Sequence, residues 1–121
     1  MKALSLKHPW AELVVQGKKT IETRKWKTNF RGLFYIHASG NIDEGMMNEF
    51  GFKNLPRQMI IGKAELIDVK EYKNKEEFDK DYDKHFAKTF VRYGFLLKNA
   101  SRIKPIPCKG QLNFFDVKIN G

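Results

Sequence analysis

The sequence predicts a mixed α+β domain, a small and strongly curved sheet or β-barrel of about six strands with two or three flanking helices. Three observations support this prediction. The 121 residues suffice for one hydrophobic core and are too few for two, so residues 1–121 should form a single domain. Hydrophobic residues make up 41% of the chain and include ten Phe, which argues against disorder. Short β-type segments alternate with short helical patterns, without repeats or linkers.

The first third of the chain should place one helix between extended segments. Pro9 suits a first helical turn, Trp10, Leu13 and Val14 share one helical face, and Gly17 is a natural stop. The expected elements are a strand at 2–6, a helix from 8 to 17, an extended segment to 26, a turn at 29–32 and a strand at 33–38 that is apolar on both faces and therefore buried.

The remainder should add two helices and the other strands. A charged surface helix is anchored by Phe78 and Tyr82 at i, i+4. The expected elements are a helix at 41–50, a loop at 54–57, a long and bent strand at 59–72, the surface helix at 74–85, a strand at 91–99, an extended edge or crossover at 101–108 and a strand at 112–119.

The charge of the chain is concentrated at its two ends. The net charge is +9, and residues 1–39 contribute +6, residues 40–90 contribute −2 and residues 91–121 contribute +5. If the fold brings the two ends together, they form one positive surface for a polyanion or a phosphorylated ligand. A lysine-rich composition of the source organism is the alternative explanation, but composition alone would not deplete acidic residues from both ends.

Several classes of protein are not indicated. A single cysteine, Cys108, allows no intrachain disulfide and fits a reducing compartment. No signal peptide or membrane span is evident, so we expect a soluble, cytoplasmic protein. His8, His37 and His85 lack zinc-site spacing, and no phosphate-binding glycine loop occurs, so no metal and no cofactor are expected. No pattern specifies an oligomeric state.

The segment GKKTIETRKW, residues 17–26, is the main candidate site. In an extended conformation, Thr20, Glu22, Arg24 and Trp26 share one face, with Ile21 and Thr23 on the other. Arg24 can donate to a phosphate or a base edge, Trp26 offers a stacking plane, and Glu22 can accept from an exocyclic amine. A solvent-exposed ion pair of at most about 1 kcal/mol is the structural alternative.

Lys19 is the candidate for chemistry within this segment. Repulsion from the neighbouring Lys18 would lower the pKa of Lys19 and favour a role as base or nucleophile activator. A phosphate contact is the simpler alternative. Glu22 lies among Lys18, Lys19, Arg24 and Lys25, so its carboxylate should stay ionised. If a reaction occurs, Lys19 and Glu22 are the expected acid/base pair.

Two other segments could contribute to the same cleft. His37 and Ser39 share one face of the strand at 33–38 and its continuation, although a lone histidine in an apolar strand is more often a core residue. Lys109 and Gly110 precede the last strand, where glycine would let the backbone approach a ligand and lysine would add positive charge. With the motif residues, the candidate ligand-binding set is Gly17, Lys18, Lys19, Glu22, Arg24, Trp26, His37, Ser39, Lys109 and Gly110.

The chain resembles the ASCH domain family of the PUA-like superfamily. The resemblance covers residues 3–117 and rests on ALSLKHPWAELVVQGKKTIETRKW, RGLFYIHAS, IIGKAELIDV and YGFLLKNASRIKPIPCKGQLNFFDV. The family signature Gly-x-Lys-x-x-Glu-x-Arg is met by Gly17, Lys19, Glu22 and Arg24. The resemblance implies a PUA-like β-barrel with a cleft beside the motif that binds RNA or modified nucleosides.

The resemblance also implies an alternative. One branch of the family is similar to amidohydrolases that deacylate N4-acetylcytidine, with the motif lysine as catalytic residue and a threonine where this sequence has Glu22. Other members are described as ribonucleases. We therefore expect a module that binds RNA or a nucleoside-type ligand in a basic cleft, with a hydrolase using Lys19 and Glu22, or a protein-interaction module, as alternatives.

Overall fold

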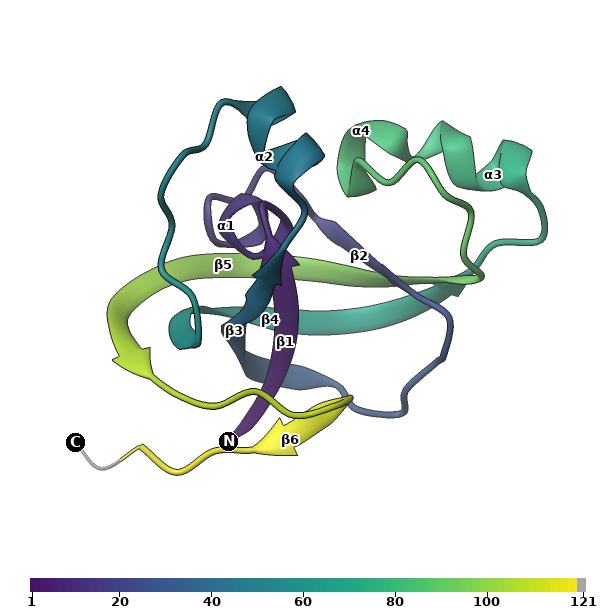
Figure 1. Cartoon of the computed structure of the whole chain (residues 1–121). Coiled ribbons are helices and arrows are strands. Elements are labelled where there is room, and N and C mark those ends of the chain that lie inside the picture. The colour runs from purple at the N-terminus through teal and green to yellow at the C-terminus, as the bar shows by residue number, and fades with distance from the viewer. Residues whose placement is uncertain (120–121) are drawn as a thin grey trace.

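The computed structural model describes residues 1–119 and shows six strands with four short helices (Figure 1). The mixed α+β class and the six strands are confirmed, and the number of helices exceeds the two or three expected. The elements in order are β1 (Lys2–His8), α1 (Trp10–Val15), β2 (Ile21–Arg24), β3 (Gly32–Ile42), α2 (Glu44–Phe50), β4 (Met59–Glu71), α3 (Lys75–Lys80), α4 (Tyr82–His85), β5 (Tyr93–Pro107) and β6 (Phe114–Asp116).

All six strands belong to one sheet in the order β2-β5-β4-β3-β1-β6. β1 pairs with β3 in parallel, and every other neighbouring pair is antiparallel. The long strands β4 and β5 curve together across the molecule, and their ladder shifts register at three places (Figure 1). Such bulges increase local twist, so the sheet curls over its own concave face.

The sheet does not close into the predicted barrel. β2 pairs only with β5, and β1 pairs with β6 only as far as Leu4, so two strand edges face each other without a ladder in residues 1–119. Side chains span this gap: Arg24 on β2 donates to the backbone oxygen of Ser5 on β1 at 2.9 Å. We call the gap between β2 and the part of β1 that begins at Ser5 the seam.

The hydrophobic core fills the concave side of the sheet. Its buried members come from β1, β3, β4, β5 and α1, and they include Leu4, Val14, Phe34, Ile61 and Phe95. α1 packs against β1, β3, β4 and β5, and therefore closes one end of the curved sheet. No helix of the described residues is long and apolar enough to cross a membrane.

The predicted helices were too long. The helix expected at 41–50 begins at Glu44, because β3 continues to Ile42 and the Asp43 side chain caps the helix by accepting from the Met46 amide. The single helix expected at 74–85 is two helices, α3 and α4, that meet at Asp81. Of its two expected aromatic anchors, Phe78 is buried but Tyr82 is 39% exposed.

Strand boundaries also differ from the expectation. The strand expected to be buried on both faces at 33–38 is exposed only at the start of one face, where Leu33 is 52% exposed, while His37 farther along the same face is buried. The two segments expected at 91–99 and 101–108 are one strand, β5, whose prolines lie at its end. The strand expected at 112–119 shortens to β6, and Leu112 is 90% exposed.

Candidate functional site

The end of α1 turns Lys19 into the interior of the protein. Gly17 adopts φ +80°, a conformation that favours glycine, directly after the helix. The backbone amides of Lys18 and Lys19 both donate to the carbonyl of Leu13, which ties the turn to the helix. Thr20 then donates its amide to Lys84 of α4, and β2 begins at the next residue. These contacts bury Lys19, whose side chain is 2% exposed, while Lys18 is exposed.

Lys19, Glu22 and Arg24 form one ion-pair network at the seam. The Lys19 ammonium lies 3.4 Å from Glu22 Oε1 and donates to the backbone oxygen of His85 at 2.6 Å. Arg24 donates through Nε to Glu22 Oε2 at 3.0 Å, and its Nη2 lies 3.0 Å from the same oxygen as an ion pair. One carboxylate with a 10% exposed side chain therefore lies between two cations, and the Glu22–Arg24 ion pair that was the structural alternative is present but is largely buried.

Burial, rather than a neighbouring lysine, lowers the pKa of Lys19. Loss of hydration lowers the pKa of Lys19, and the Glu22 carboxylate raises it in opposition, while Arg24 lowers it further. Lys18 does not contribute to the shift of the pKa of Lys19, so the cause proposed from the sequence was wrong although the direction was right. Glu22 contacts Lys19 and Arg24 but neither Lys18 nor Lys25.

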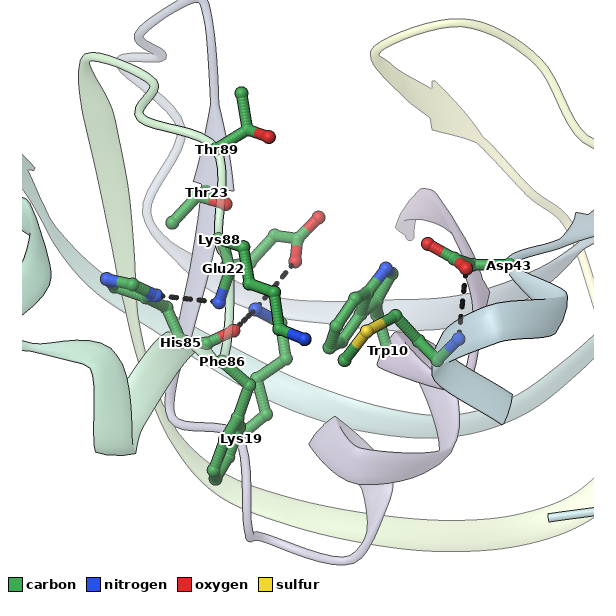
Figure 2. Close-up of a pocket in the computed structure, with 11 residues that line it drawn as sticks. Trp10, Lys19, Glu22, Thr23, Asp43, His85, Phe86, Lys88 and Thr89 are labelled. Atoms are coloured by element: carbon green, nitrogen blue, oxygen red, sulfur yellow. Dashed lines mark hydrogen bonds and ion pairs between the residues drawn. The ribbon is translucent and has the colours of Figure 1, made fainter. Parts of the chain in front are cut away.

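A cavity of about 320 Å³ opens above Lys19 and Glu22 (Figure 2). The indole of Trp10 lies on one side, with the Lys19 ammonium 5.3 Å from its ring centroid. The end of α4 and the residue that follows it lie on the other side and contribute His85 and Phe86. This first cavity therefore combines an aromatic wall with a charged floor.

Two more cavities continue from the first along the seam. The second, of about 350 Å³, shares Trp10, Glu22 and Thr23 with the first. The third, of about 530 Å³, shares a different set with the second: Ser5, Ser39, Gln111 and Leu112. The three cavities adjoin one another at these shared residues, and we call them together the seam groove.

A chain of hydrogen bonds runs beneath the seam groove. Beyond Arg24, the Ser5 hydroxyl lies 2.9 Å from His37 Nδ1, and His37 Nε2 lies 2.6 Å from the backbone oxygen of Cys108. The carbonyl accepts from Nε2–H, so Nδ1 is left to accept from the Ser5 hydroxyl. Cations, carboxylate, hydroxyl and imidazole are thereby held in fixed positions from Lys19 to Cys108.

The other predicted site residues divide between the groove and the surrounding structure. Gly17 and Lys18 lie on the exposed turn and line none of the three cavities. Trp26 packs edge-on against Phe95 and Phe114, with its ring centroid 5.9 Å from the guanidinium carbon of Arg24. It supports Arg24 from the core side instead of lining the seam groove.

The candidates from β3 and the last loop meet at the third cavity. Ser39, Lys109 and Gly110 line it, together with His37, which is fully buried and bonded at both ring nitrogens. Gly110 lies so close that an added Cβ would be 2.8 Å from His37 Cε1. The histidine is thus a structural support of the cavity wall, and glycine permits the close approach of the loop.

Sequence reasoning missed several lining residues. Trp10 was expected only to share a helical face with Leu13 and Val14, yet it lines the first two cavities. Ser5 and Lys7 lie beyond the β6 pairing of β1, a position that no local pattern reveals. Asp43 and Lys88 reach the first cavity from α2 and from the segment after α4. Only the capping role of Asp43 had a signal in the sequence.

The groove chemistry is that of recognition by charge, stacking and hydrogen bonds. Within residues 1–119, no three side chains of His, Cys, Asp or Glu gather in a way that could hold a metal ion. The groove offers an aromatic face at Trp10, a carboxylate acceptor at Glu22 and cationic donors at Lys7 and Arg24. This combination suits a ligand that has both a planar polar ring and negative charge.

Comparisons with known proteins point to one family. The model of the ASCH domain matches residues 4–107. The mouse protein Activating signal cointegrator 1 is 30% identical over 123 residues, which cover 88% of this chain and 20% of that protein. The human protein of the same name is 29% identical with the same coverage. The chain thus spans about a fifth of the length of these curated relatives.

Solved structures agree at the level of the fold. The crystal structure of ASCH from Zymomonas mobilis has a TM-score of 0.65 and 20% identity, and the similarity covers 87% of this chain and 71% of that one. Two mutant forms of the same protein give the same TM-score. Since the family model spans most of the sequence and the fold agrees, the chain belongs to the ASCH domain family.

Proposed function

We propose that this ASCH domain binds RNA or a nucleoside-type ligand in the seam groove. The observation that carries the proposal is the Lys19–Glu22–Arg24 network at the base of an aromatic-walled cavity. A network that only stabilised the fold would be covered by packed side chains, whereas this one borders open cavities on two sides. A buried lysine with a lowered pKa beside a cavity is typical of functional sites.

The first cavity fits a nucleobase. Its volume of about 320 Å³ lies at the lower end of the range for small-molecule sites. Trp10 provides a stacking surface, and base–aromatic stacking contributes about 1–3 kcal/mol per base. Each Glu22 oxygen already accepts from a cation but keeps lone-pair capacity, so the carboxylate can also accept from the exocyclic amine of a base.

Binding of RNA is tested by fluorescence anisotropy with short single-stranded and hairpin RNA at several salt concentrations. Affinity should fall steeply with added salt, because each neutralised phosphate releases counterions. Arg24→Ala should weaken binding by about tenfold or more, because it removes a charge-assisted donor. The matched control is Lys73→Ala, an equal loss of charge at an exposed residue that lines none of the cavities.

Two results would contradict the proposal. One is the absence of binding to any of these RNAs at low salt, or binding that does not respond to salt. The other is an equal loss of affinity in Arg24→Ala and Lys73→Ala. Melting temperatures of all variants are measured in parallel, because Arg24 also donates to the Ser5 backbone and a collapse of the fold would mimic a loss of binding.

A hydrolase that uses Lys19 and Glu22 is the second candidate function. The observation in its favour is the burial that lowers the pKa of Lys19, together with the 3.4 Å separation from Glu22 Oε1 at the floor of a cavity. A lysine with a lowered pKa can act as a proton donor or acceptor closer to neutral pH. In this arrangement, one of the two groups would activate water and the other would protonate the leaving group.

Incubation with N4-acetylcytidine, with chromatographic detection of cytidine, tests this alternative. We expect weak or no turnover, because Glu22 is held by both cations and occupies the space beside Lys19. Rapid conversion that disappears in both Lys19→Ala and Glu22→Ala would make the protein an enzyme. The same preparations are assayed for RNA binding, so that a misfolded variant is not read as a catalytic loss.

A further inference from the structure

The charges that line the seam groove are distributed unevenly. The first cavity has two amines and two carboxylates, and its charged residues are Lys19, Lys88, Glu22 and Asp43. Its formal charge is therefore balanced. A neutral base fits such a cavity, whereas a phosphate would lie against the two carboxylates.

The second and third cavities have an excess of positive charge. The second is lined by Lys7 and Arg24 with Glu22, and the third is lined by Lys109 without a carboxylate. Among residues 1–119, Lys7 and Lys109 form no ion pair, and Arg24 Nη1 has no hydrogen-bond partner. The unused donors of the groove are thus concentrated beyond the first cavity.

The three cavities are in a fixed order. The second adjoins the first at Glu22 and Thr23 and adjoins the third at Ser39 and Leu112. Leu112 is 90% exposed at the second boundary, where an apolar side chain can pack on a base. A ligand that extends out of the first cavity therefore meets cationic donors first and an apolar contact next.

We infer that the seam groove binds two consecutive nucleotides of a single RNA strand. The base of one nucleotide occupies the first cavity, the linking phosphate lies in the second beside Lys7 and Arg24, and the neighbouring nucleoside occupies the third beside Lys109 and Leu112. A paired base could not enter the first cavity, so the strand is single at this point. The inference rests on the proposed function and adds the length of the minimal ligand and the place of its phosphate.

Isothermal titration with cytidine and the dinucleotide cytidylyl-3′,5′-cytidine tests the inference directly. The dinucleotide should bind about tenfold or more tightly than the nucleoside, because it adds a charge-assisted phosphate contact. Cytidine 3′-monophosphate and 5′-monophosphate form the second pair of ligands. The one that gains affinity over cytidine identifies the direction of the strand, and a lack of gain for both would overturn the inference.

A comparison of Lys7→Ala with the control Lys25→Ala distinguishes a contact between Lys7 and the phosphate from a general effect of lost positive charge. Lys25 is exposed and lines none of the three cavities. Lys7→Ala should weaken binding of the dinucleotide several-fold and reduce the slope of log affinity against log salt concentration by about 0.7. The affinity for cytidine should stay the same. Lys25→Ala should change the affinity for neither ligand. Lys109→Ala should weaken binding of the dinucleotide but should not weaken binding of either monophosphate.

The outcomes distinguish this inference from the proposed function. If cytidine binds as tightly as the dinucleotide, or if Lys7→Ala and Lys25→Ala behave alike, the two-nucleotide inference is wrong and nucleoside binding stands. If neither these ligands nor longer RNA bind to the folded wild-type protein, both proposals are wrong.

Discussion

Glu22 and Asp81 are both buried carboxylates held by cations, yet their surroundings differ. Glu22 is bonded by Lys19 and Arg24 and borders two cavities. Asp81 accepts from Lys70 at 2.8 Å and from the Tyr72 hydroxyl at 2.6 Å, where α3 meets α4. The Asp81 cluster connects two helices to a strand, whereas the Glu22 cluster borders open space.

The exposure of the cations is the other difference. The Lys70 side chain is 42% exposed and keeps most of its hydration, while the Lys19 side chain is 2% exposed. Burial and the contact with Asp81 raise the pKa of Tyr72, so its hydroxyl stays a donor and completes the Asp81 cluster. A buried ion pair that lines cavities indicates binding, whereas the Asp81 cluster lines none of the three cavities and connects two helices to a strand, which indicates a structural role.

Removing either carboxylate should have the largest effect on the free energy of unfolding, and the size of the loss should differ between the two clusters. Glu22→Ala leaves the buried Lys19 without its anionic partner and should lower the free energy of unfolding by about 3 kcal/mol or more. Asp81→Ala leaves the Tyr72 hydroxyl without an acceptor but a hydrated Lys70, and should cost about 1–3 kcal/mol. Urea denaturation of both variants measures the difference.

A double variant checks the cause of the larger loss. Lys19→Met combined with Glu22→Ala should recover part of the stability lost in Glu22→Ala, because no unpaired ammonium is left in the interior. If Asp81→Ala proves the more destabilising change, or the double variant is no more stable than Glu22→Ala, burial of Lys19 does not control the stability of the site.

A neutral substitution of Glu22 should change ligand preference. Because the Glu22 carboxylate accepts from an exocyclic amine, the wild type should prefer cytidine to uridine. In Glu22→Gln the amide can also donate to uracil O4, which the carboxylate cannot do. The preference for cytidine over uridine should therefore shrink or reverse. The expected change in discrimination is about 1–3 kcal/mol, roughly five- to 150-fold in the affinity ratio. Asp81→Asn, measured by the same titrations with both nucleosides, should leave the ratio as it is.

The pH dependence of stability should reveal the histidines before Asp81. Burial lowers the pKa of both His8 and His85 from the ordinary value of 6.5. Below pH 6.5 the unfolded chain therefore binds more protons than the folded one, and stability falls as pH falls, by at most about 1.4 kcal/mol per pH unit for each histidine.

Asp81 should respond only at lower pH. Burial would raise the pKa of Asp81, but hydrogen bonds from Lys70 and Tyr72 outweigh that effect and lower it from the ordinary value of 3.8. Its stabilising contribution is present above pH 3.8 and is lost as pH falls through its folded pKa. Urea denaturation between pH 7.5 and 3 should show two separate losses. His85→Gln should reduce the first, and an unchanged stability from pH 7 to 5 would contradict this assignment.

The smallest effect is expected at Lys18. It is exposed and lies outside the network, so Lys18→Ala should change the free energy of unfolding by no more than about 0.5 kcal/mol. Lys19→Ala removes a buried cation from the adjacent position and should cost several times more. Thermal denaturation of the two variants compares neighbours of the same residue type, and equal shifts would show that burial of Lys19 is energetically unimportant.

Local patterns predicted most elements but not their limits. Six strands and the stop at Gly17 followed from alternation and glycine, which act over a few residues. The split between α3 and α4 depends on Asp81, whose side chain bonds residues outside the helix. The exposure of Leu33 depends on which face of the sheet has no covering element, and local periodicity does not specify this.

The amino-acid sequence alone determined the family signature, the excess of positive charge at both ends and the placement of Glu22 and Arg24 on one strand face, because these depend on residue identity and short spacing. The tertiary structure decided that Lys19 is buried, that Trp10 is open to a cavity and that Ser5 and Lys7 belong to the site. These three facts depend on where the curved sheet stops short of closing. The position of that seam results from register shifts and strand lengths summed over the whole sheet, and no local segment specifies it.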